Sequence, residues 1–158
     1  MDKWIRIFFY TFMVLLFMNG CNSTKGTEDI FQYKGSFVGD NSAIANIVHQ
    51  LPGGEHIEEI ELNTSVEPFG IVLTYDWMES EKRYIETAIN NATFIFTLVQ
   101  NAGWITFHFN DYEYKLGKVE LQKWYGDELR EYSSEDELKK QIETFLEDES
   151  KVKLLIGA

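Results

Sequence analysis

The chain has very few of the residues that cross-link or interrupt a small domain. Its 158 residues include one cysteine, Cys21, and two prolines, Pro52 and Pro68. A single cysteine excludes an intramolecular disulfide, so a hydrophobic core has to supply the stability. Both prolines lie in predicted turns, and neither interrupts a predicted helix or strand.

Basic side chains are also scarce. The chain has 14 Lys and Arg residues and 26 Asp and Glu residues, which gives a formal net charge of −12. Nucleic-acid binding depends on neutralising phosphates, so this balance argues against nucleic acid as a partner. The same charge disfavours adhesion to anionic lipid or anionic wall polymers. A cationic partner or loosely held divalent ions remain compatible with it.

The apolar run at residues 7–18 is too short to span a bilayer. It has twelve residues and follows Lys3 and Arg6, whereas a membrane-spanning helix needs about 20. A positive segment followed by a short apolar one is typical of a secretory signal, which we place at residues 1–20. Gly20 then precedes Cys21, as a small residue precedes the acylated cysteine of bacterial lipoproteins.

Cys21 is therefore the predicted lipidation site. Met18 and Asn19 depart from the usual Leu-Ala/Ser-Gly-Cys pattern, and a signal anchor or an ordinary cleaved signal is the alternative. Several acyl chains (palmitate or similar), at about 0.8 kcal/mol per buried methylene, would hold the protein firmly at a membrane. Residues 21–29 are polar and aperiodic, which predicts a tether. Residues 30–158 have the length of a single domain.

Apolar spacing predicts alternating helices and strand pairs in that domain. Apolar residues spaced three and four apart indicate helices at 43–50, 81–101, 118–125 and 134–146. Alternation indicates strands at 57–62 and 69–77, and 103–116 is the clearest hairpin, turning at Asn110-Asp111. Gly103 and Gly126 are predicted helix ends, and Ser134 with Glu137 forms a predicted capping box. Residues 152–156 alternate again, which favours a last strand.

The resulting order is α-ββ-α-ββ-α-α with an optional final β. Two hairpins imply an antiparallel sheet of four to five strands with helices packed on one face, an α+β fold. The strand at 103–109 has one entirely apolar face, and we expect the helices to cover that face. The expected covered set is Ile105, Phe107 and Phe109, and the expected uncovered set is Trp104, Thr106 and His108.

The segment Gly39-Asp40-Asn41-Ser42 is the first candidate for chemistry. A hydrolase nucleophile needs Gly-x-Ser-x-Gly, but Ala43 and Ile44 follow the serine. A calcium-binding loop starting at Asp40 would need a glycine at its sixth position and a glutamate at its twelfth, where the chain has Ala45 and Leu51. The segment fits the cap of the first helix, with Asp40 or Asn41 accepting an amide hydrogen bond.

No catalytic set, metal site or cofactor motif is predicted. The three histidines, His49, His56 and His108, are far apart in sequence. His56 has the carboxylates of Glu58 and Glu59 close by, but no second cluster completes a site. A zinc site needs three or four ligands at recognisable spacing. The open alternative is a small hydrolase or metal-dependent enzyme in which His56 or His108 meets carboxylates only in space.

Aromatic residues make up 15% of the chain. Their simplest role is to fill the core of a domain without disulfides. The alternative is a surface for a peptide, a glycan or a partner protein, because Trp and Tyr dominate binding hot spots. The candidates for such a surface are Trp77, Trp104, Tyr112, Tyr114 and Trp124.

Three stretches carry a resemblance to a known family: YKGSFVGDNS at 33–42, GWITFHFND at 103–111 and KWYG at 123–126. They resemble an uncharacterised domain family of Gram-positive bacteria, whose members are small predicted lipoproteins. A similar domain is appended to membrane metallopeptidases of the antibiotic-sensor type. The matching motif residues are Tyr33, Ser36, Phe37, Val38, Gly39, Asp40, Asn41 and Ser42.

The resemblance covers about residues 30–148 and implies an extracytoplasmic sensory or accessory role by analogy alone. It implies no peptidase activity, because this chain lacks a His-Glu-x-x-His motif. We therefore expect a lipoprotein on the outer face of a Gram-positive cell membrane. Its domain is expected to be non-enzymatic and to bind a protein, a peptide or an envelope ligand.

Overall fold

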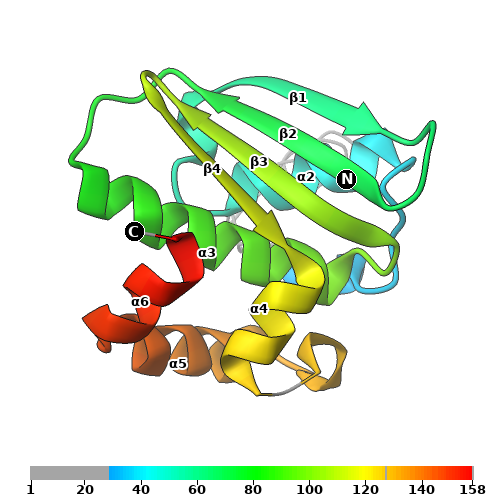
Figure 1. Cartoon of the computed structure of the whole chain (residues 1–158). Coiled ribbons are helices and arrows are strands. Elements are labelled where there is room, and N and C mark those ends of the chain that lie inside the picture. The colour runs from blue at the N-terminus through cyan, green and yellow to red at the C-terminus, as the bar shows by residue number, and fades with distance from the viewer. Residues whose placement is uncertain (1–28, 127, 158) are drawn as a thin grey trace, which may run out of the picture.

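The computed structural model describes residues 29–126 and 128–157. A four-stranded sheet lies on one side of the molecule and the helices lie on the other (Figure 1). The strands are β1 (Ile57–Asn63), β2 (Phe69–Tyr75), β3 (Ala102–Phe109) and β4 (Tyr112–Gly117). The helices are α2 (Asn41–Gln50), α3 (Glu81–Leu98), α4 (Lys118–Tyr125), α5 (Glu135–Leu146) and α6 (Glu149–Ile156). Short 3-10 turns lie at Ile30–Tyr33, Gly54–His56 and Leu129–Glu131. The α+β class and the order α-ββ-α-ββ-α-α are as predicted.

The sheet is mixed, and the prediction of a purely antiparallel sheet was wrong. The strand order is β1-β2-β3-β4, and the two predicted hairpins form the antiparallel outer pairs. The central pair, β2 with β3, is parallel. The long helix α3 connects these two strands and returns the chain to the end of the sheet where β2 begins, as a parallel crossover requires. The sequence signals of the two hairpins do not determine which of their strands pair with each other, or in which direction.

The core lies between α3 and the helix-facing side of the sheet. Ile105, Phe107 and Phe109 are fully buried there, which confirms the expected covered face. Ile89 and Phe96 on α3 are also fully buried. On the other face of β3, Trp104 and His108 are partly exposed, whereas Thr106 is only 8% exposed. Burial of this large apolar set is the main stabilising term.

Residues 152–156 belong to helix α6, so the optional last strand is not formed. The carboxylate of Asp148 accepts hydrogen bonds from the amides of Ser150 and Lys151, at 3.1 and 3.2 Å, and so starts a helix. Gly157 ends it in the left-handed conformation, with φ of 72°. The preference of five alternating residues for a strand is weaker than the stabilisation of a helix that has a cap at each end.

The ends of two predicted helices also differ from expectation. Helix α3 stops at Leu98, and Gly103 lies inside β3, where an added Cβ would be 2.5 Å from the Cβ of Pro68. Gly103 therefore serves a close approach between chain segments rather than a helix end. At α5 the Ser134 hydroxyl accepts from the Glu137 amide at 3.3 Å, but the Glu137 carboxylate accepts from the Ser133 amide rather than from that of Ser134. Gly126 ends α4 with φ of 79°, as predicted.

Candidate binding groove and the predicted site residues

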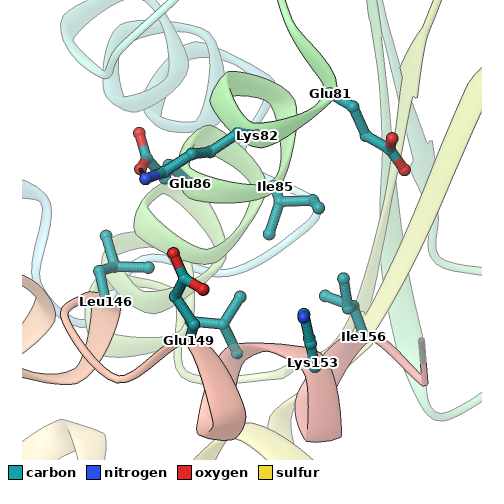
Figure 2. Close-up of a pocket in the computed structure, with 9 residues that line it drawn as sticks. Glu81, Lys82, Ile85, Glu86, Leu146, Glu149, Lys153 and Ile156 are labelled. Atoms are coloured by element: carbon teal, nitrogen blue, oxygen red, sulfur yellow. Dashed lines mark ion pairs between the residues drawn. The ribbon is translucent and has the colours of Figure 1, made fainter.

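A groove with a volume of about 330 Å³ lies between α3 and α6. Its apolar floor comes from α3, from the end of α5 and from α6, and consists of Ile85, Leu146, Val152 and Ile156. Figure 2 shows Ile85 projecting from α3 into the space that faces Ile156 on α6. All four floor residues are partly buried. Small-molecule sites begin at about 300 Å³, so the groove is large enough for one bulky apolar group.

Charged side chains surround that floor: Glu81, Lys82, Glu86, Glu149 and Lys153. Lys82 Nζ lies 3.9 Å from Glu86 Oε1, one turn along α3. Glu81, Glu149 and Lys153 have no ion-pair partner among the described residues. An apolar floor with a charged rim is the usual layout of a site that binds an amphipathic group.

The other wall of the groove is held in place by α4 and α5. Trp124 of α4 donates its indole hydrogen to the Lys151 carbonyl at 2.9 Å. Its ring packs 5.0 Å from that of Phe145 on α5, and Lys151 Nζ lies 4.6 Å from the centroid of the Phe145 ring. These contacts fix α6 to its neighbours α4 and α5, and space remains between α6 and α3.

Tyr114 of β4 lies close to the groove residue Glu81. Its pKa is raised, first by burial and then by the negative charge of Glu81. Its hydroxyl is buried and has no hydrogen-bond partner among the described residues. A buried hydroxyl without a partner costs about 1–3 kcal/mol.

The polar side chains of the groove are all glutamates and lysines. The described residues that line it include no histidine, cysteine, serine or threonine. Elsewhere His49 Nδ1 lies 3.0 Å from the Gly54 carbonyl, and His108 lies 3.6 Å from Glu113. In the described part of the chain, no group of three histidine, cysteine or carboxylate residues is placed to hold a metal ion.

His56 is the histidine that meets several carboxylates. Together with Glu55, Glu58 and Asp76 it lines a hollow of about 310 Å³ at the start of β1. His56 Nε2 lies 3.7 Å from Glu55 Oε1, and the imidazole stacks on Trp77 at 5.4 Å between ring centroids. The arrangement brings one histidine and three acids to one surface hollow, as the enzyme alternative requires.

The motif at residues 33–42 lies against the end of α3. Asp40 caps α2 as predicted, because its carboxylate accepts from the Ala43 amide at 3.0 Å. The Ser36 hydroxyl donates to the Tyr33 carbonyl at 2.6 Å, and Ser36 pairs with Val99 in a parallel bridge. These contacts join the start of the domain to its longest helix, which is a structural role.

Three other motif residues have fewer contacts. Asn41 and Ser42 are exposed in the first turn of α2. An added Cβ at Gly39 would meet nothing within 4 Å, and its φ is not positive. The structure therefore gives no steric reason for a glycine at position 39.

The five candidate aromatic residues lie in three places. Tyr112 stacks on Tyr114 at 6.4 Å, and both Tyr112 and Trp77 contact Tyr84, at 5.5 and 6.2 Å between ring centroids. The other two lie apart: Trp104 is on the uncovered sheet face, and Trp124 packs between α4 and α5. The five rings do not form a single surface.

The sequence does not predict the groove, because residues 152–156, which form part of one wall, alternate in polarity and indicate a strand. The available signal was Asp148, an N-cap residue directly before 149–156, with Gly157 directly after. A helix there places Val152 and Ile156 one turn apart on one face.

The predicted signal peptide and Cys21 lie outside the described residues, as does the tether apart from Asp29. In the described part of the chain, no helix has both the length and the hydrophobicity that a bilayer span requires. No curated protein and no solved structure is significantly similar to the chain. A family model matches residues 30–118, which is more than half of the chain. The protein belongs to the family described as a domain of unknown function, DUF4825.

Proposed function

We propose that this protein is a lipoprotein on the outer face of a Gram-positive cell membrane, anchored through an acylated Cys21, whose domain binds a ligand and carries out no reaction. The observation that carries the binding role is the α3–α6 groove, with its apolar floor and charged rim. The ligand is a protein, a peptide or an envelope component that presents one bulky apolar group.

Two further observations support the proposal. The sequence of residues 1–21 has the positive segment, the short apolar segment and the single cysteine of a lipoprotein leader. The resemblance to domains appended to membrane metallopeptidases of the antibiotic-sensor type favours a sensory or accessory role at the cell surface, by analogy.

Metabolic labelling tests the anchor. The full-length protein is expressed in a Gram-positive host that is fed an alkyne-tagged palmitate, and the label is measured in the membrane fraction. We expect Cys21→Ser to lose the label and Ser23→Ala, which leaves the thiol in place, to keep it. Equal labelling of the Cys21→Ser variant would overturn the lipid anchor.

Binding of a neutral apolar dye, N-phenyl-1-naphthylamine, tests the groove in the purified protein. Ile85→Glu places a carboxylate on the groove floor, and Leu154→Glu places one on the outer side of α6, where the leucine is 80% exposed. Loss of one buried apolar contact is worth about 1.5–3 kcal/mol, so we expect Ile85→Glu to weaken binding about tenfold or more. Equal binding by both variants would exclude the groove as the dye site.

The second candidate is a small hydrolase or metal-dependent enzyme, and the His56 hollow favours it. The described residues there are not placed to hold a metal ion, so the imidazole would act as a general base beside Glu58 and Asp76. Release of p-nitrophenol from p-nitrophenyl acetate by the wild type and by His56→Ala tests this form. Equal rates for the two proteins would eliminate it.

A further inference from the structure

The sheet face opposite the helices has no described element over it (Figure 1). The strand registers arrange its residues in rows, one of which runs Glu61, Val72, Thr106 and Lys115. Glu61 is exposed and Val72 is half-buried, although both lie in the matched family region. This face is separate from the α3–α6 groove and independent of it.

Trp104 is held rigidly on this uncovered face. An added Cβ at Gly70 would lie 2.0 Å from the Cε2 of the indole, so only glycine at position 70 lets the ring lie against the sheet. The indole hydrogen donates to the Pro68 carbonyl at 2.8 Å. Lys115 Nζ lies 4.8 Å from the ring centroid. The ring is therefore fixed in position. Lys115 of the same chain makes a cation–π contact with it.

Beside this ring lies a hollow of about 550 Å³. Val66, Pro68 and Val72 line it together with the indole, and the carboxylates of Glu61 and Glu67 line it as well. Val66 is 73% exposed, which leaves apolar surface open at the rim. The hollow suits a side chain that has an apolar stem and a positively charged head.

The part of this face that β1, β2 and their connecting loop supply is strongly acidic. Between Lys34 and Lys82 the chain has nine acidic residues and no lysine or arginine. Three of the nine, Glu59, Glu61 and Glu67, lie on this side of the sheet or in the loop beside it, and none has an ion-pair partner among the described residues. Uncompensated carboxylates next to an open apolar surface favour a basic occupant.

We propose that the uncovered sheet face, from Trp104 to strand β1, is a docking surface for a basic, extended segment of a partner protein. One lysine or arginine side chain of that segment enters the hollow beside Trp104. Its aliphatic stem packs on Val72 and the indole, and its charged head lies between Glu61 and Glu67. A further basic residue of the segment reaches Glu59, the next outward-facing residue of β1.

Fluorescence anisotropy of the full-length protein in neutral detergent tests this proposal. The probe is a fluorescein-labelled hexapeptide in which lysine and valine alternate, and the control peptide has glutamate in place of lysine. We expect the lysine peptide to bind and the glutamate peptide not to bind. Exposed ion pairs contribute little individually, so we expect the double variant Glu61→Gln, Glu67→Gln to weaken binding about three- to tenfold. Trp104→Gln, which removes the ring, should weaken it at least as much.

The matched control removes two carboxylates elsewhere. Glu143 and Glu147 are exposed on or next to α5 and have no ion-pair partner among the described residues. Their double glutamine variant should bind the lysine peptide within about twofold of the wild type, because the attraction is local. Equal weakening by the two double variants would overturn the proposal in favour of a general charge effect.

Two other outcomes would also overturn the proposal. One is the absence of wild-type binding at peptide concentrations up to about 1 mM, the weak end of measurable affinity. The other is a dimer in analytical ultracentrifugation that Glu61→Gln with Glu67→Gln dissociates, because it would assign the face to a second copy of the chain.

Discussion

The region that matches the family and the last two helices, α5 and α6, are packed very differently. In residues 30–118, α3 is buried along most of its length and the central strands β2 and β3 supply fully buried side chains. Beyond that match, α5 buries only Leu138 and Ile142, and α6 buries no residue. Stability should follow this difference in burial, because local opening costs least where few apolar contacts are lost.

The groove lies where these two regions meet. Ile85 and the rim residues Glu81, Lys82 and Glu86 come from the matched region, and the opposite wall comes from the end of α5 and from α6. The matched region alone therefore contains only half of the groove. The uncovered sheet face, in contrast, lies entirely within the match. A ligand of the groove would depend on both regions, and a partner of the sheet face on only one.

Phe107→Ala in the matched region should have the largest effect. Phe107 is fully buried at the centre of the sheet, and such a truncation costs about 3–5 kcal/mol of unfolding free energy. Urea unfolding followed by circular dichroism measures this loss. Leu154→Ala on α6, where the leucine is 80% exposed, is the control and should change stability by less than about 0.5 kcal/mol. Similar losses in the two variants would contradict the difference in packing.

Trp124→Ala should release the second region without unfolding the first. The change removes the hydrogen bond to the Lys151 carbonyl and the packing on Phe145. Because the indole is only partly buried, we expect a loss of about 2 kcal/mol, below that of a fully buried ring. Hydrogen exchange should show lower protection in α5 and α6 and unchanged protection in β2 and β3. Equal loss of protection in β2 and β3 would show that both regions unfold together.

What the sequence could predict follows this division only in part. The matched region has strong periodic signals, such as Ile85 to Val99 along α3, and its helices and hairpins were predicted from them. The parallel pairing of β2 with β3 was not, because it depends on how two hairpins meet rather than on either of them. Residues 152–156 have weak apolar contrast, and the caps at Asp148 and Gly157 decided their structure. The groove depends on that helix and was missed with it.

Two helix caps allow a matched comparison of the regions. The Asp40 carboxylate caps α2 in the matched region, and the Ser134 hydroxyl caps α5 outside it. Either alanine substitution removes one cap, worth about 1 kcal/mol. We expect Asp40→Ala to lower the global unfolding free energy by that amount. We expect Ser134→Ala mainly to lower the hydrogen-exchange protection of amides within α5. Chemical denaturation with hydrogen exchange distinguishes the two, and identical behaviour would mean that α5 shares the cooperativity of the core.

An effect that depends on pH concerns the junction at Lys118, where the family match ends and α4 begins. Burial, and after it the charge of Arg130, lower the pKa of Lys118 to about 8, although the charge of Glu128 opposes the change. Lys118 Nζ lies 3.4 Å from the Gln100 carbonyl, which also accepts a hydrogen bond from Arg130. A second cation on the same carbonyl favours the neutral amine.

The direction of the pH dependence follows from that lowered pKa. Between about pH 8 and 10, the unfolded chain binds a proton at Lys118 that the folded chain does not, so the unfolding free energy rises with pH. Lys118→Met should flatten this rise, and Lys153→Met, at an exposed position on the groove rim, should keep it. Urea midpoints measured from about pH 7 to 9.5 test this below the range in which unfolded tyrosines ionise. A rise that persists in Lys118→Met would assign the titration to another group, and the junction would then contribute no pH dependence of its own.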